Sequence, residues 1–219
     1  MSDIGLYDAM SSCRAVRRLR SDPIPDDVIH RVLQAAAWAP TGGNNQPWRI
    51  VAVRDPARKR ALGDLYQPIW AEYAANSRRS TSKLDEERRS GVLRTLAAGD
   101  YLASHLGEAP LIAVFCFNPR NMAITDAGLD RPSVVGGGSV YPAVQNLLLA
   151  CRAEGLGCVL TTLLCMKEAE VKQLLDIPED WFTCAAVPIG YPVLRGHGPL
   201  SRRPLDTLVY ADRWNEPFA

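Results

Sequence analysis

Four short apolar runs constrain the fold of this chain more than any other feature of its sequence. Each run has the length of a β-strand and is followed or preceded by turn residues, as expected of strands that are buried in a core. The runs are Ile50 to Val53, Leu111 to Phe117, Cys158 to Leu164 and Phe182 to Ile189. Segments with helical spacing separate them, so the sequence predicts an interleaved pattern of strands and helices.

The first clear helix is expected from Asp26 to Ala39, where apolar residues recur with helical spacing. Asp26 is the expected N-terminal cap and Pro40 the terminator. Further helices are predicted at about Pro56 to Tyr66 and at Lys167 to Leu175.

The most apolar helix is expected from Val140 to Cys151, and it is therefore predicted to lie at the centre of the fold. Gly155 and Gly157 follow it at positions suited to a left-handed cap. Gly136, Gly137 and Gly138 precede it, where they could either free backbone amides for an anion or allow close packing.

In three segments the apolar residues follow no regular pattern. Ser77 to Ser90 is dense in charge and is expected to form a solvated helix or a mobile flap. The loop from Asn118 to Ser133 is long enough to be a lid or a dimer contact. After Gly190 the chain is rich in proline and carries the aromatic residues Tyr210, Trp214 and Phe218, which are expected to lie on another surface.

The 219 residues, of which 47% are hydrophobic, are enough for one domain, so residues 1–219 are expected to fold as a single unit. A net charge of +1 argues against nucleic acid as a partner. No apolar run is long enough for a bilayer, and Asp3 and Asp8 stand where a signal peptide would be basic, so a cytoplasmic location without membrane contact is expected. The six cysteines lie in or beside apolar segments and are expected to be reduced rather than metal ligands.

Common catalytic and nucleotide-binding motifs are missing. His30, His105 and His197 stand apart and no Gly-x-Ser-x-Gly turn occurs, so a hydrolytic triad has no support. Neither the phosphate loop with its lysine nor the three-glycine dinucleotide fingerprint is present. His30 is expected on the surface, and His105 is expected to interact with main-chain carbonyls.

Arginine is more informative than histidine. Arg14, Arg17, Arg18 and Arg20 cluster near the N-terminus, and Arg202 and Arg203 cluster in the tail. Guanidinium groups bind phosphate with two hydrogen bonds, but a solvated basic face explains the same residues. The arginines alone leave both interpretations open.

Several segments resemble the nitroreductase family. The N-terminal segments are Cys13 to Leu19, Asp22 to Pro25 and Ala39 to Trp48, and Pro40 to Trp48 is the most specific part. The later segments are Tyr141 to Ala150 with Gly155 to Gly157, then Gly190 to Pro192, and Arg202 to Pro204. The resemblance covers most of the chain and is weakest between Tyr66 and Ala109.

The resemblance implies an α+β fold in which a mixed central sheet is covered by helices and the C-terminal tail extends over a partner subunit. It also implies a homodimer that holds FMN between its subunits. By position, Arg14, Ala15 and Arg17 would form the first flavin-binding strip, and Arg203, with or without Arg202, would approach the phosphate. The partner would supply Pro40, Thr41, Gly42 and Asn44 to the ring, and the N5 edge would face the backbone of Thr161, Thr162 and Leu163.

Two positions depart from the family pattern: Cys13 stands where a second arginine is common, and Ala15 stands where serine is common. Leu19 replaces a usual phenylalanine and keeps its apolar character.

The flavin would carry the chemistry, so no catalytic side chain is assigned. NAD(P)H would reduce it, and the flavin would then reduce an electrophilic acceptor such as a nitroaromatic or quinone. The alternatives are a reductase that uses a deazaflavin, and a flavin-binding or sensing protein that turns over slowly. The acceptor and the donor are not predicted, nor are the pocket residues contributed by region 66–109.

Overall fold

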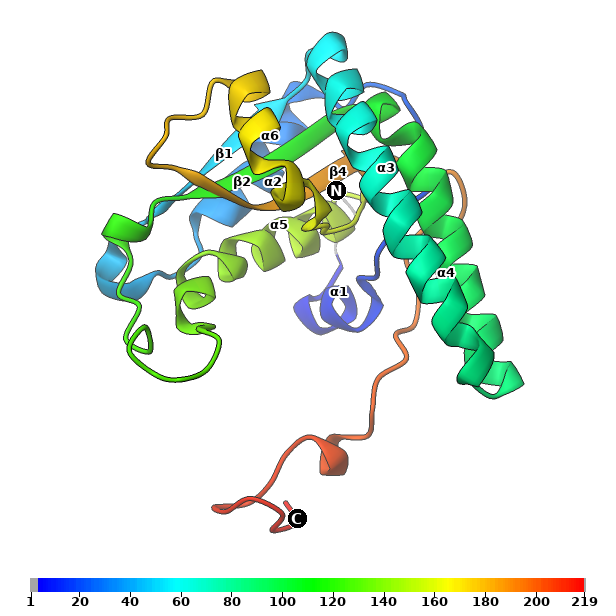
Figure 1. Cartoon of the computed structure of the whole chain (residues 1–219), viewed down its shortest axis with the longest axis vertical. Helices are drawn as coiled ribbons and strands as arrows, with labels where there is room; N and C mark the ends of the chain where they lie inside the picture. Colours follow the sequence, from blue (N-terminus) through cyan, green and yellow to red (C-terminus); the bar gives the residue numbers. More distant parts are fainter. Residues whose placement is uncertain (1–3, 219) are drawn as a thin grey trace.

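A four-stranded sheet forms the centre of the computed structural model, which describes residues 4–218 (Figure 1). Its strands are β1 (Trp48–Val53), β2 (Leu111–Phe117), β3 (Gly157–Cys158) and β4 (Phe182–Gly190), in the order β1-β2-β4-β3. The α+β class is confirmed, but every pairing among these strands is antiparallel, where a mixed sheet was predicted. Between β1 and β2 the chain forms a helical hairpin that returns it to the same end of the sheet, so β2 runs opposite to β1.

Helices cover both faces of the sheet. One face carries α2 (Asp26–Ala37) and α5 (Tyr141–Ala153), and the other carries α3 (Pro56–Ser80), α4 (Glu86–His105) and α6 (Glu168–Leu175). The side chains of β2 alternate between these layers: Ala113 and Phe115 pack with α2 and α5, whereas Ile112 and Val114 face the other side. A continuous apolar run is what a strand buried on both faces requires.

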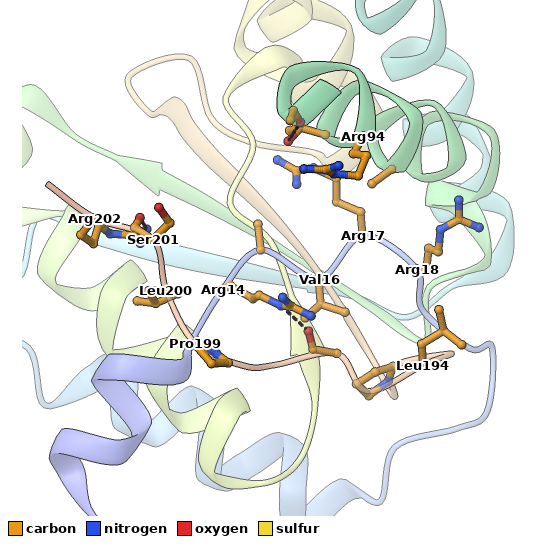
Figure 2. A pocket seen from close by; sticks show the side chains of 16 residues that line it. Arg14, Val16, Arg17, Arg18, Arg94, Leu194, Pro199, Leu200, Ser201 and Arg202 are labelled. Atoms are coloured by element: carbon orange, nitrogen blue, oxygen red, sulfur yellow. Dashed lines mark hydrogen bonds between the residues drawn. The ribbon is translucent and has the colours of Figure 1, made fainter. Parts of the chain in front are cut away.

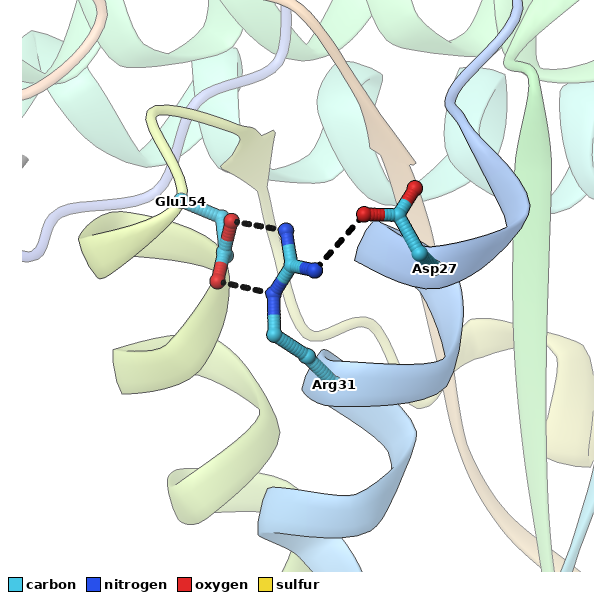
Figure 3. Close-up of polar contacts among 3 residues, drawn as sticks. All are labelled: Asp27, Arg31 and Glu154. Atoms are coloured by element: carbon cyan, nitrogen blue, oxygen red, sulfur yellow. Dashed lines mark hydrogen bonds and ion pairs between the residues drawn. The ribbon is translucent and has the colours of Figure 1, made fainter. Parts of the chain in front are cut away.

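An ion pair ties α2 to α5 beside this core (Figure 3). Arg31 donates from Nε and Nη2 to the two carboxylate oxygens of Glu154 at 2.8 and 2.9 Å, and from Nη1 to Asp27 at 2.7 Å. The hydrogen bond with Arg31 holds the pKa of Glu154 below its usual value. α2 itself begins at Asp26, which is its first helical residue; the expected capping role is wrong, because Pro25 occupies the cap position.

α3 is much longer than predicted. Its cap is Asp55, which accepts a hydrogen bond from the amide of Arg58 at 2.8 Å, and the helix continues through Pro68 to Ser80. A proline inside a helix costs about 3 kcal/mol. Burial of the stripe that includes Ile69, Trp70 and Ala74 outweighs that cost. The charged stretch Ser77 to Ser90 forms the exposed tip where α3 turns into α4.

The central helix ends as expected. Gly155 has φ +73° and the amide of Leu156 donates to Cys151 O at 2.8 Å, as in a left-handed C-terminal cap. Gly157 has another role: a Cβ there would lie 2.6 Å from Val16 Cγ1 and 2.9 Å from Leu19 Cδ2. Gly157 therefore allows the N-terminal segment to lie against β3.

Short segments complete the chain. α1 (Leu6–Ser12) packs beside α5. The loop after β2 is organised by Asp126, whose buried carboxylate accepts hydrogen bonds from Ser133 Oγ at 2.6 Å and Arg131 Nη1 at 2.8 Å. The 3₁₀ turns are Gly42–Asn44, Thr81–Lys83, Leu106–Glu108, Pro119–Asn121, Val135–Ser139, Leu163–Lys167 and Leu205–Thr207.

The C-terminal tail leaves the body of the protein after about residue 200 (Figure 1). It exposes Leu205, Leu208, Trp214 and Phe218, and Trp214 keeps 81% of its surface accessible. Tyr210 and Trp214 contact one another, with ring centroids 5.0 Å apart. That the tail covers a partner subunit stays a prediction.

Candidate functional site

An extended strip, residues 13–20, carries the first candidate residues. Main-chain hydrogen bonds attach it to the sheet: Val16 N donates to Cys158 O at 2.8 Å, and Arg20 N donates to Tyr191 O at 2.8 Å. Val193 N donates back to Arg18 O at 3.0 Å. Val16 is buried, whereas the arginine side chains leave the core.

The strip forms one wall of a cleft of about 600 Å³ (Figure 2). The opposite walls come from α4, through Gly91 and Arg94, and from the tail. Arg14 Nε donates to Gly196 O at 2.7 Å, which fixes that side chain at the cleft. The residues that line it are Arg14, Ala15, Val16, Arg17, Arg18, Gly91, Arg94, Thr95, Ala98, Pro192, Leu194, Gly196, Pro199, Leu200, Ser201 and Arg202.

Five arginines line this cleft, and no carboxylate within residues 4–218 lines it. None of the five forms an ion pair with another described residue. Elsewhere arginines do pair with acids, as Arg20 does with Asp22 at 3.3 Å. Cations that gather without a counter-charge favour binding of an anion. The cleft is thus a candidate site for a phosphate group.

A second, smaller cavity of about 210 Å³ adjoins the cleft, and Arg17 lines both. Its walls include Thr161, Thr162 and Leu163, together with the aromatic residues Tyr66, Trp70 and Tyr73 of α3. Main-chain hydrogen bonds between Thr161 and Ala186, at 2.8 and 2.9 Å, hold the backbone at this wall. One ligand with an anionic end and a flat apolar end would fit across the two cavities.

A hydrogen bond and close packing fix Trp70 in the second cavity. Its Nε1 donates to Asp100 Oδ1 at 2.9 Å, and the other carboxylate oxygen of Asp100 pairs with Arg78. Behind the ring, a Cβ on Gly99 would lie 2.0 Å from Trp70 Cζ2, so only glycine fits there. Burial raises the pKa of the neighbouring Tyr66, which stays neutral.

The sequence model of the nitroreductase family matches residues 11–191. The chain belongs to the nitroreductase family. The class predicted from the sequence, an NAD(P)H-dependent flavin oxidoreductase, is thereby confirmed.

Relatives within the family have diverse activities. An NADH dehydrogenase of Thermus thermophilus is 32% identical over 204 residues, which cover 90% of each chain. A 5,6-dimethylbenzimidazole synthase of Rhodospirillum rubrum is 35% identical over 182 residues, 82% of this chain and 78% of the relative. The rat iodotyrosine deiodinase 1 is 29% identical over 205 residues, 93% of this chain and 68% of the relative.

Solved structures show the same fold. Nitroreductase A from Vibrio parahaemolyticus superimposes with a TM-score of 0.67 at 20% identity, over 96% of this chain and 76% of that one. The NADPH:FMN oxidoreductase from Vibrio harveyi, complexed with NAD⁺, has a TM-score of 0.65 at 22% identity, over 96% and 78%.

The most specific segment of the family resemblance, Pro40 to Trp48, lies apart from the two cavities. In Figure 1 its turn is at the opposite end of the sheet from α3 and α4. Gly43, Asn44 and Gln46 have φ values of +60°, +56° and +46°. Positive φ at Asn44 and Gln46 costs about 1 kcal/mol or more at each residue, so the surroundings must hold this shape.

Hydrogen bonds hold the strained turn. Gly42 N donates to Ser139 Oγ at 3.1 Å, and Gln46 N donates to Thr41 Oγ1 at 3.0 Å. Strained, exposed backbone is typical of functional loops. In one chain, however, the described residues of the two cavities do not include Pro40, Thr41, Gly42 or Asn44. That the partner subunit supplies them stays a prediction.

The structure separates the two tail arginines. Arg202 lines the cleft, whereas Arg203 lies outside the set of described residues that do so. Sequence reasoning missed Arg94, Trp70 and Asp100, which come from the divergent region 66–109. The only signal in the sequence was the positive charge of Arg94 within a helix.

The histidines and the glycines before α5 have structural roles or lie on the surface. His30 is exposed, and Nδ1 of His105 lies 2.7 Å from Tyr101 O, as expected. His197 Nε2 lies 2.7 Å from Leu156 O, and burial lowers its pKa. Gly136 and Gly137 pack closely against Met122 and Tyr141, which favours the packing explanation over an anion site.

The cysteines are free thiols, three of them buried and three half-buried. Burial raises the pKa of Cys13 to about 11 and that of Cys116 to about 12, so these two are not reactive thiolates. Among residues 4–218 there is no group of three or more His, Cys, Asp or Glu that could hold a metal ion. No helix in the described part of the chain is both long and apolar enough to cross a membrane.

Proposed function

We propose that the chain binds FMN across the two cavities that meet at Arg17 and transfers a hydride from NAD(P)H through the flavin to an electrophilic acceptor such as a nitroaromatic or quinone. The proposal rests on one observation: a cleft lined by arginines without counter-charge adjoins a cavity lined by aromatic residues. Bound flavin supplies the redox chemistry, accepting a hydride and passing it on.

The chain's own residues position this cofactor. Arg14 and Arg202 would bind the phosphate, and Arg17, which lines both cavities, would lie between the phosphate and the ring. The backbone of Thr161 to Leu163 lines the ring cavity and offers amide hydrogen-bond donors. Arg203 follows Arg202 on the exposed tail and is not among the described residues that line the cleft.

The departures from the family pattern are compatible with this role. Ala15 lines the cleft without a hydroxyl group, so it contributes only its backbone. Cys13 donates from Sγ to Leu148 O at 3.5 Å and so turns toward α5. Arg94, from the facing helix, adds positive charge to the same cleft.

We also propose a homodimer with a shared active site. The body leaves apolar side chains of α1 uncovered, namely Leu6, Tyr7 and Met10, and the tail leaves Trp214 and Phe218 uncovered. Exposed apolar surface of this extent favours a protein partner. A second copy would also bring the turn of residues 41–46 to a flavin site. Light scattering should give about twice the 24.0 kDa mass of one chain.

Purified protein tests the central proposal. It should be yellow, and acid treatment followed by chromatography should release FMN. Anaerobic addition of NADH or NADPH should bleach the flavin rapidly. Folded protein that neither contains FMN nor takes it up would refute the cofactor. Slow bleaching by both nicotinamides with fast bleaching by a reduced deazaflavin would show that the donor is the deazaflavin.

A further inference from the structure

The tail segment of residues 196–198 fixes one arginine of the cleft. Gly196, which lines the cleft, accepts the hydrogen bond from Arg14 Nε at 2.7 Å (Figure 2). Two residues later, the amide of Gly198 donates to Ser12 O at 3.1 Å. The segment therefore lies against residues 12–14, and the position of the Arg14 side chain depends on where the segment is held.

His197, between these two glycines, attaches the segment to the core. Its Nε2 lies 2.7 Å from Leu156 O, and because a carbonyl oxygen only accepts hydrogen bonds, Nε2 carries the proton. The other ring nitrogen, Nδ1, is buried and has no hydrogen-bond partner among the described residues. Protonation would turn Nδ1 into a charged, buried donor without an acceptor, which is costly.

The charges around His197 also favour its neutral form. The charged side chains that act on the ring are Arg152 of α5 and Arg14 of the strip, and both are cationic. No described carboxylate forms an ion pair with the ring. Burial lowers the pKa of His197 below its usual value and the two guanidinium groups lower it further, although the hydrogen bond to Leu156 acts the other way. His197 is therefore neutral at pH 7.

We propose that His197 is a pH-sensitive positioning residue for the cofactor phosphate. While it is neutral, it holds residues 196–198 against Leu156, so that the Gly196 carbonyl keeps Arg14 at the cleft. Its protonation at acidic pH releases the segment, frees Arg14 and weakens cofactor binding. The inference rests on the proposed function, because the ligand whose affinity changes is FMN.

Proton linkage sets the direction and the size of the effect. In the released segment His197 regains the ordinary histidine pKa of about 6.5, which lies above the pKa of the attached ring. The released form therefore binds more protons. Below about pH 6.5, each further pH unit favours release by up to about 10-fold, until the attached ring is protonated as well.

Hydrogen exchange and flavin titration test this release, with His197→Gln as the conservative variant. The glutamine amide nitrogen can donate to Leu156 O but does not titrate. Relative to that variant, the protection of the Gly198 amide in the wild type should fall by about 3- to 10-fold between pH 7 and pH 5.5, followed by NMR. Over the same range the Kd of FMN, from fluorescence titration, should rise by about 2- to 10-fold more in the wild type. The Kd of riboflavin should change equally in both proteins.

A double-mutant cycle shows whether His197 acts through Arg14. His197→Ala should weaken FMN binding by about 2- to 10-fold at pH 7.5, the scale of one lost hydrogen bond. The same change should add little in a protein that already carries Arg14→Ala. His30→Gln is the matched control, because His30 is exposed on α2 and is not among the described residues that line the cleft. Its pH profile should match the wild type, and melting temperatures verify that each variant is folded.

The same pH profile for the wild type and His197→Gln in either measurement would overturn the inference, and so would losses of His197→Ala and Arg14→Ala that add in full. Folded protein that binds no FMN at any pH would refute the proposed function instead. Hydrogen exchange of the wild type against His197→Gln would then still decide whether protonation releases the segment.

Discussion

Replacing Gly99 by alanine would place a methyl group inside the Trp70 ring. The added Cβ would lie 2.0 Å from Cζ2, 2.1 Å from Cη2 and 2.9 Å from Cε2, all of which are shorter than any normal contact. Gly99 belongs to α4 and Trp70 to α3, so relief requires either the ring to move or the two helices to separate.

Three contributions set the expected size of the effect. Overpacking a core costs about 1 to 3 kcal/mol. Displacing the ring also breaks the hydrogen bond from Nε1 to Asp100, at about 0.5 to 1.5 kcal/mol. Alanine regains about 0.5 to 1 kcal/mol of helix propensity. The net loss is about 0.5 to 4 kcal/mol, or about 1 to 16 °C in Tm for a domain of this length.

Gly91→Ala is the matched control on the same helix, because a Cβ there would meet only Arg94 Nη2, at 4.0 Å. Helix propensity alone should then stabilise the protein by about 0.5 to 1 kcal/mol. Thermal unfolding followed by circular dichroism measures both variants, and tryptophan fluorescence reports on the Trp70 ring. If Gly99→Ala melts with or above the wild type, the close approach of the two helices is not real.

Three further predictions concern the cofactor, the kinetics and the loop. Arg14→Ala and Arg202→Ala should each weaken FMN binding by about 1 to 3 kcal/mol, measured by fluorescence titration, and should barely affect riboflavin; equal losses for both ligands would give these arginines a structural role. Steady-state plots at several fixed acceptor concentrations should be parallel, as in ping-pong kinetics, and intersecting lines would rule out a cavity shared by donor and acceptor. Hydrogen bonds from Ser133 and Arg131 lower the pKa of Asp126, so its stabilisation is complete above about pH 4 and is lost as the pH falls through the lowered folded pKa. Asp126→Asn should therefore reduce the Tm more at pH 6 than at pH 3, and an equal reduction at both values would contradict the assignment.

The strands and the central helix were accessible from sequence because their signal is local. Leu111 to Phe117 is apolar at every position, and the structure forms β2 over the same residues. Gly155 ends α5 in the left-handed conformation that its position suggested. The strand predicted from Cys158 to Leu164 is much shorter in the structure. Only Gly157 and Cys158 form β3, and a 3₁₀ turn begins at Leu163.

Strand direction and the full extent of α3 were not accessible, because they depend on contacts between distant segments. No local pattern distinguishes a mixed sheet from an antiparallel one when the strands appear in the sequence as continuous apolar runs. Pro68 lies inside α3, which packs along α4, α6 and the turns Leu106–Glu108 and Leu163–Lys167.

Some residues of the candidate site could also be predicted from the sequence, and others could not. The arginine strip and Thr161 to Leu163 were named from the family resemblance and do line adjoining cavities. Arg94 and Trp70 could not be named, because nothing in the sequence shows which face of α3 or α4 turns toward the strip. The contribution of the turn of residues 41–46 depends on a second chain, and it remains a prediction.

The attachment of the strip through its main chain has an evolutionary consequence. Val16 and the backbone hydrogen bonds to Cys158 and Tyr191 keep the strip on the sheet whatever the outward-facing side chains are. Substitutions at those outward positions can therefore change the ligand with little loss of stability. A scaffold that separates folding from recognition in this way can diversify its chemistry by single mutations, and relatives as different as a dehydrogenase, a synthase and a deiodinase are what such a scaffold would be expected to produce.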